Sequence, residues 1–109
     1  MPYELNGTIL ASDDEGYLLE PNYSDEIVPI IAAAENIVLT PEHWQVIEYL
    51  RNIYKDEGKT PNFRNLLKDI QAFMPEASSQ SLYDLFPVGP AKQAVKIAGL
   101  PQPYGKGGY

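Results

Sequence analysis

The chain of 109 residues contains no cysteine, which excludes disulfides, thiolate metal ligands and cysteine nucleophiles. Its single histidine, His43, leaves too little material for a zinc site or for a catalytic triad or dyad. No group of residues provides a nucleophile together with its own base. From the sequence we therefore expect no metal, no cofactor and no enzyme activity.

Long apolar runs are also missing. The longest, Ile27 to Ala34, contains Pro29 and is far shorter than the roughly 20 residues of a membrane helix. The first residues, Met1 to Glu4, lack the basic start and apolar stretch of a secretory signal. With 44% hydrophobic and 21% charged residues, the composition is typical of a soluble globular protein. We expect one cytoplasmic domain over residues 1–109, without membrane contact.

Positive charge is scarce and unevenly placed. The net charge of −7 argues against general affinity for nucleic acid. Residues 1–57 carry 12 acidic and 2 basic side chains, a net charge of −10, whereas residues 58–109 carry 3 acidic and 6 basic ones, a net charge of +3. Such a dipolar surface can orient a protein on a partner, although solvation alone explains the charges equally well.

Local patterns predict a mainly helical chain that opens with strands. Asn6-Gly7 between two apolar-polar stretches is typical of a β-hairpin, so residues 1–19 are expected to form a hairpin region. Helical periodicity continues from residue 24 to residue 99. Prolines and glycines from residue 100 onward end it, which predicts a flexible arm at 100–109. The expected fold is a small orthogonal helical bundle with a helix-turn-helix-like core.

Capping residues and prolines mark the expected helix boundaries. Helices are predicted to start at Ser24 or Asp25, Thr40-Pro41, Thr60-Pro61, Ser78 or Ser79, and Pro90. Gly58, Pro75 and Gly99 are predicted to end the second, third and fifth. The first helix should bury Ile27, Ile30, Ile31 and Ala34. His43 shares an apolar stripe with Val46 and Ile47, so we interpret it as a hydrogen-bonded core residue rather than a catalytic one.

Six blocks in order resemble the TusE and DsrC family of sulfur-relay proteins, which includes DsvC and sulfite reductase gamma-subunit-like proteins. They are Asn6-Gly7, Asp14-Glu15-Gly16-Tyr17-Leu18, Leu39-Thr40-Pro41-Glu42-His43-Trp44, Pro61 with Arg64 and Leu66, Leu85-Phe86-Pro87-Val88-Gly89-Pro90-Ala91-Lys92, and Ala98-Gly99-Leu100-Pro101-Gln102-Pro103. The resemblance implies a helical fold with an N-terminal hairpin and a C-terminal arm.

The resemblance also implies where the family's sulfur-carrying thiols would stand. Aligned on the stretch from Gly99 to Pro103, the terminal cysteine position falls on Lys106 and the upstream one on Val95. A thiol with a pKa of about 8.5 is partly ionised at neutral pH and accepts sulfur, whereas a lysine with a pKa of about 10.4 stays protonated. The family's cysteine chemistry is therefore missing from this chain.

The preferred interpretation is a non-catalytic binding or regulatory protein of sulfur metabolism, which docks on sulfurtransferase or sulfite-reductase-type partners. Its expected contact residues are Lys92, Lys96, Pro101, Pro103, Tyr104 and Lys106. One alternative is a DNA-binding regulator of sulfur-metabolism genes, in which Arg64 and Lys68 contact phosphates. Another is a sulfur carrier whose cysteines were replaced by engineering.

Overall fold

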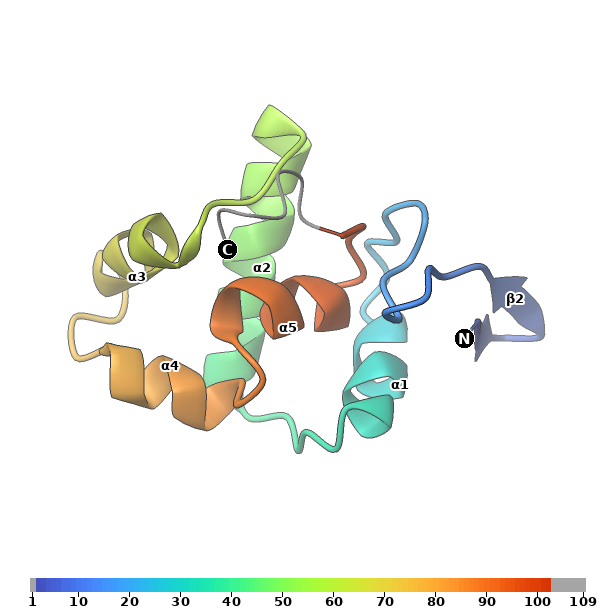
Figure 1. Ribbon diagram of the computed structural model, residues 1–109, viewed down its shortest axis with the longest axis horizontal. Coiled ribbons are helices and arrows are strands. Elements are labelled where there is room, and N and C mark those ends of the chain that lie inside the picture. Colours follow the sequence, from blue (N-terminus) through green and yellow to red (C-terminus); the bar gives the residue numbers. More distant parts are fainter. Residues whose placement is uncertain (1, 103–109) are drawn as a thin grey trace.

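The computed structural model describes residues 2–102, and this part of the chain holds five helices and one two-stranded antiparallel sheet (Figure 1). The elements are β1 (Tyr3–Leu5), β2 (Thr8–Leu10), α1 (Ile27–Ala34), α2 (Pro41–Glu57), α3 (Phe63–Gln71), α4 (Ser79–Leu85) and α5 (Pro90–Ile97). The predicted mainly helical fold with an N-terminal hairpin is confirmed. Most of the predicted arm, residues 103–109, lies outside the described residues.

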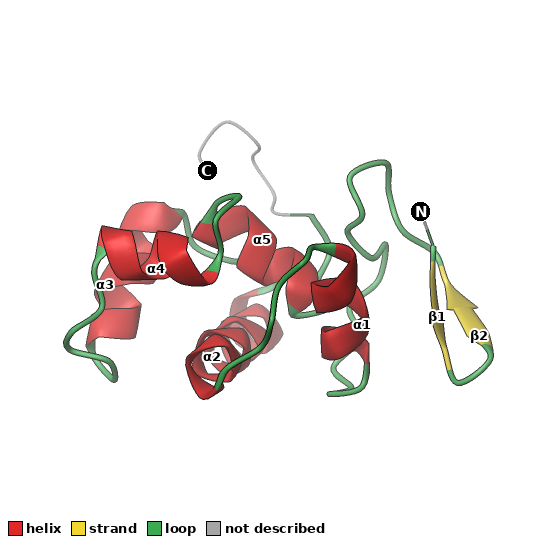
Figure 2. Cartoon of the chain, turned by 90° about the horizontal axis from the view of Figure 1, so that it is seen from below, coloured by secondary structure: helices red, strands yellow, loops and turns green. Residues whose placement is uncertain are grey.

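The hairpin has the geometry that its turn sequence predicts. Asn6 and Gly7 both have positive φ angles, of 52° and 83°, which a two-residue hairpin turn of the I′ type requires. Tyr3 pairs with Leu10, and the Tyr3 hydroxyl donates a hydrogen bond to the carbonyl of Gly16 over 2.7 Å. The hairpin lies at one end of the molecule beyond α1 (Figure 2), and β1 contacts that helix.

Two helices depart from their predicted limits. α3 begins at Phe63 and not at Pro61, because Asn62 is extended and its side chain accepts a hydrogen bond from the Asn65 amide. It ends at Gln71, where the amides of Ala72 and Phe73 bond to carbonyls three residues earlier and tighten the chain.

The first helix does not bury all of its predicted positions, because Ile30 is only half-buried and Ala34 is exposed.

The buried face of α1 is instead formed by Ile27, Val28, Ile31 and Ala32. The N-cap of this helix is Glu26, one or two residues after the predicted Ser24 or Asp25. The other three starts are as predicted: Pro41 and Pro90 open α2 and α5, and Ser78 caps α4.

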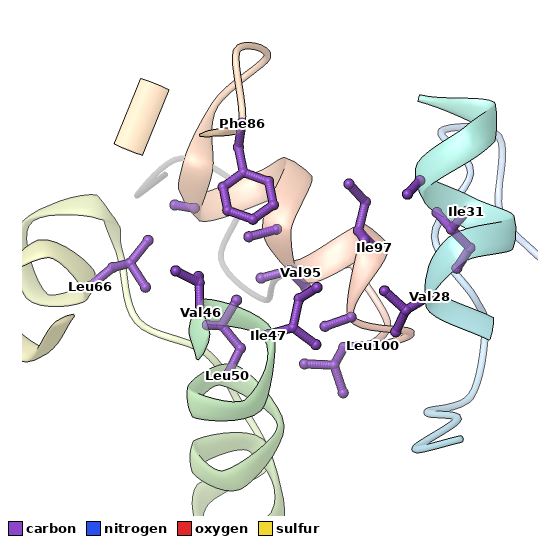
Figure 3. Close-up of a cluster of buried hydrophobic side chains, with 14 of the residues drawn as sticks. Val28, Ile31, Val46, Ile47, Leu50, Leu66, Phe86, Val95, Ile97 and Leu100 are labelled. Carbon is purple, nitrogen blue, oxygen red and sulfur yellow. The ribbon is translucent and has the colours of Figure 1, made fainter. Parts of the chain in front are cut away.

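The core is built around α5, which packs against α1, α2, α3 and α4. Figure 3 shows the convergence of side chains from these elements. The buried cluster includes Val46, Ile47 and Leu50 of α2, Val95 and Ile97 of α5, Leu100 after it, Val28 and Ile31 of α1, Leu66 of α3, and Phe86. Because every helix contributes to one cluster, α5 is held from several sides, and so is the chain that leaves it.

Within residues 2–102, no helix is long and apolar enough to cross a membrane. α3 and α4 follow each other around residues 72–78, and each packs against α5. The predicted helix-turn-helix function of this pair stays a prediction.

Candidate functional site

The chain leaves α5 through a tightly fitted root, formed by Gly99 and Leu100. Gly99 has a φ angle of +82°, and a Cβ atom on it would lie 2.5 Å from the carbonyl oxygen of Asn22. The Asn22 amide donates a hydrogen bond to the Gly99 carbonyl over 2.8 Å. Leu100 is fully buried. The direction of the chain after α5 is therefore fixed by the segment before α1, not by the helix alone.

A buried arginine holds this root from the α2 side. Arg51 is 6% exposed, and its Nε donates to the Ala98 carbonyl over 2.9 Å. Its two terminal nitrogens donate to the Ser24 carbonyl and to the Asp25 carboxylate, each over 2.8 Å. The guanidinium thus joins α2, the entry of α1 and the exit of α5. Sequence reasoning missed Arg51, although its position beside Leu50 and four residues after Ile47 puts it on the buried stripe.

A second polar cluster ties α5 to the end of α1. The Gln93 amide donates to one Glu35 oxygen over 3.0 Å, and the Lys96 ammonium lies 3.2 Å from the other. Lys96 is only 14% exposed at its side chain and lies 5.2 Å from the centre of the Tyr17 ring. Its charge is therefore engaged inside the protein. Lys92, one turn earlier on α5, is exposed.

The loop before Tyr17 closes over the root. Tyr17 is buried and its hydroxyl donates to the Lys92 carbonyl over 3.2 Å. Burial raises the pKa of the Tyr17 hydroxyl well above its ordinary value, and the nearby carboxylates of Glu15, Asp13 and Glu35 raise it further. The side chain of Gln102 donates to Glu15 over 3.2 Å. Loop, helix and the beginning of the C-terminal segment thus form one connected surface.

The raised pKa of Tyr17 predicts how stability changes in alkali. The folded protein keeps this hydroxyl protonated, while the unfolded chain ionises it near pH 10. The contribution of Tyr17 to the free energy of unfolding is therefore complete below about pH 10 and is lost as pH rises further. We expect the free energy of unfolding to fall more steeply above pH 10 in the natural protein than in Tyr17→Phe. Urea unfolding at a series of pH values measures this, and parallel curves for the two proteins would contradict it.

The structure separates the residues that the sequence singled out. Val95 is fully buried in the core, so the position that the resemblance gives to the upstream cysteine faces apolar side chains (Figure 3). Pro101 is half-buried, next to the root. Pro103, Tyr104 and Lys106 lie outside the described residues. The six predicted contact residues therefore stay predictions, of which Lys92 is the one whose side chain the structure leaves exposed on α5.

The residues of the DNA-binding alternative lie elsewhere. Arg64 and Lys68 are exposed on α3. The neighbouring α4 carries no lysine or arginine, and its Asp84 is exposed. This pair of helices offers few positive charges for phosphate contact.

His43 has the structural role that its position predicts. Its Nε2 lies 2.9 Å from the Leu85 carbonyl, and its Nδ1 lies 3.0 Å from the Thr40 amide and 2.8 Å from the Thr40 hydroxyl. A carbonyl can only accept and an amide can only donate, so Nε2 carries the proton. His43 thereby ties the start of α2 to the end of α4, where its ring meets Phe86 edge-on at 5.1 Å.

Within the described part of the chain, no group of histidine, aspartate and glutamate side chains is placed to hold a metal ion. Over residues 2–102 the geometry defines a helical protein whose chain leaves α5 through a tightly fitted C-terminal root.

Similarity to known proteins shows the family of this chain. The family model described as DsrC like protein matches residues 4–106. Sulfurtransferase TusE of Pectobacterium atrosepticum is 44% identical over 103 residues, which cover 92% of this chain and 94% of the relative. The chain therefore belongs to the DsrC-like family, together with the TusE sulfurtransferases.

Solved structures agree with this assignment. The oxidized gamma-subunit of the dissimilatory sulfite reductase (DsrC) from Archaeoglobus fulgidus superposes with a TM-score of 0.87 and 37% identity, covering 96% of this chain and 98% of that one. A chain in the crystal structure of dissimilatory sulfite reductase I superposes with a TM-score of 0.76 and 31% identity, over 96% and 98% of the two chains.

These relatives correct one expectation. The prediction that the chain is not an enzyme is contradicted, because relatives covering nearly its whole length are sulfurtransferases. The expectation rests on the missing cysteines and on the lack of a nucleophile with its own base in this chain, and neither absence outweighs the similarity to sulfurtransferases.

Proposed function

We propose that this protein is a binding and regulatory member of the sulfur-relay family. It docks on a sulfurtransferase or a sulfite-reductase-type partner without passing sulfur through a cysteine of its own. The observation that carries the proposal is the coexistence of a firmly built C-terminal root, at Gly99 and Arg51, with a chain that lacks every thiol. The cytoplasmic location predicted from the sequence belongs to this proposal.

The root supports docking because it is already ordered before a partner arrives. A contact surface whose side chains and backbone are fixed in advance loses less conformational entropy on binding. Lys92 lies at the start of α5 beside a small hollow of about 130 Å³, which Tyr83 and Val88 also line. Val88 is 72% exposed and Tyr83 is 46% exposed. An exposed cation next to exposed apolar side chains suits a protein partner with an acidic rim.

Charge reversal at Lys92 tests the docking surface. We expect Lys92→Glu to weaken binding to the cognate sulfurtransferase or sulfite-reductase-type complex by about tenfold, because a favourable rim charge becomes repulsive. Lys68→Glu is the matched control, since Lys68 is also an exposed lysine on a helix. Calorimetry or surface plasmon resonance with the purified partner measures both.

Equal losses in the two variants would contradict a specific role for the α5 surface. A loss confined to Lys68→Glu would favour the α3 face, and a gel-shift with the promoter of the protein's own operon would then test the DNA-binding alternative. No binding of the natural chain, while a cysteine-bearing relative binds well, would overturn the proposal.

Restoring a thiol gives a separate prediction. We expect Lys106→Cys to gain the mass of one sulfur atom after incubation with a persulfide donor, because the thiolate at that position accepts sulfane sulfur. Val95→Cys is the control, since Val95 is fully buried and a thiol there would stay protonated and shielded. Intact-mass spectrometry reads the result. Equal loading of both variants, or of neither, would contradict the assignment of Lys106 to the family's carrier position.

A further inference from the structure

A second surface lies on the opposite side of α2 from α1 and the hairpin, where α3 and α4 flank that helix (Figure 1). Two hollows, of about 600 Å³ and about 580 Å³, follow the exposed face of α2. Both are lined by Gln45 and Phe73, so they lie side by side, and we refer to the two together as the groove. No residue of α5 lines it, which makes the groove distinct both from the hollow beside Lys92 and from the root at Gly99 and Leu100.

The floor of the groove is apolar at its centre. Phe73 is 44% exposed, although its ring contacts Tyr49 of α2 with 6.1 Å between ring centres. The Tyr49 hydroxyl in turn donates to Asp69 of α3, which fixes the pair of rings between the two helices. Met74 lines the first hollow and Ile53 lines the second, so the apolar floor extends to both sides of Phe73. A large apolar side chain held in place yet open to solvent is typical of a contact site.

The rim of the groove is negative. The carboxylate side chains that line it are Glu42, Glu48, Asp56, Glu57, Glu76 and Asp84, and no lysine or arginine lines either hollow. Both ion pairs found within residues 2–102 lie elsewhere, at Arg51 and at Lys96. These like charges repel one another, and a cationic ligand would relieve the repulsion.

The dimensions of the groove favour a helix as its occupant. From Glu42 to Asp56 the groove follows α2 for about 20 Å, at about 1.5 Å per residue, which equals about four helical turns. Helices and the connection after α3 provide all of its walls, so no strand edge is open for an added β-strand. Apolar anchors on one face of a helix and cations beside them match the floor and the rim.

We propose that this groove binds a basic amphipathic helix of a partner protein, with an apolar side chain of that helix seated against Phe73. This inference does not depend on docking at the root. A relay protein with two separate contact surfaces can hold one partner while it meets another.

The test uses the full-length chain and a synthetic peptide of about 14 residues with leucines on one helical face and lysines on the other. An acidic peptide with glutamates in place of the lysines is the control probe. In an NMR titration of the isotope-labelled protein, we expect amide shifts at Gln45, Tyr49 and Phe73 with the basic peptide, and none with the acidic one. Binding should weaken as salt is added.

Two charge-matched variants decide whether the groove is the site. Glu48→Gln, Asp56→Asn and Glu76→Gln together remove three rim charges; Glu4→Gln, Asp14→Asn and Glu20→Gln together remove three exposed charges at the hairpin end. We expect the first triple variant to lose about tenfold in affinity and the second less than about twofold. Phe73→Ala should also weaken binding.

Equal losses in the two triple variants would show general charge attraction and overturn the inference. So would shifts centred on Lys92 and Gly99, or no binding of the basic peptide at all. Because the shifts are read residue by residue, failure of the groove and failure of the root surface are separate outcomes.

Discussion

Gly99→Ala is expected to lower the free energy of unfolding by about 3 kcal/mol or more. The new Cβ atom would lie 2.5 Å from the Asn22 carbonyl oxygen and 3.1 Å from a methyl group of Ile27, and the φ angle of +82° would disfavour alanine as well. The backbone of Asn22 would have to move, which would break its hydrogen bond to the Gly99 carbonyl. Urea unfolding measures the loss.

Gly58→Ala separates backbone strain from crowding. Gly58 has a similar φ angle of +71°, but a Cβ atom on it would meet nothing within 4 Å. Its replacement should therefore cost only about 1 kcal/mol, the conformational penalty alone. If the two alanine variants were equally stable, the close approach between the root and the segment before α1 would be refuted.

Arg51→Met is the second change with a large expected effect, a loss of about 2–4 kcal/mol. Methionine keeps much of the apolar stem but removes the donors to the carbonyls of Ala98 and Ser24, which then stay buried or partly buried without those hydrogen bonds. The ion pair with Asp25 contributes less, since the Asp25 side chain is 74% exposed and water screens it.

The matched control is Arg64→Met, which removes an exposed arginine from α3 and should cost less than about 0.5 kcal/mol. Hydrogen exchange gives a second readout, because loss of Arg51 should speed exchange at Asn22 and Leu100 more than at Leu66 of α3. A uniform change across the protein would mean that Arg51 does not act at the root.

The features that sequence predicted well are those that a few neighbouring residues determine. Asn6-Gly7 favours the positive φ angles of a tight hairpin turn, and Thr40-Pro41 starts α2 together with His43, only three residues further on. The start of α3 was predicted wrongly, because Asn62 competes with Thr60 as the N-cap. Its side chain offers a better cap than Thr60, and the competing cap decides where α3 begins.

The features that sequence missed depend on residues far apart in the chain. Arg51 meets Ser24 and Ala98, and Gln93 meets Glu35, only after the helices have packed.

Two residues of α5 and its exit show the same dependence. Gly99 was predicted to end α5, and it follows the C-cap Ala98 directly, but its contact with Asn22 depends on where the segment before α1 runs. Lys96 stays a predicted contact residue, but the sequence did not show that its ammonium pairs with Glu35 and lies 5.2 Å from the centre of the Tyr17 ring.

We propose that this chain recognises the sulfur machinery without a thiol of its own. Native mass spectrometry of the full-length protein, mixed with its purified sulfurtransferase or sulfite-reductase-type partner and a persulfide donor, tests it in one measurement. We expect a non-covalent complex in which the mass of the chain is unchanged. A chain that has gained covalently bound sulfur, or that forms no complex while a cysteine-bearing relative does, would contradict it.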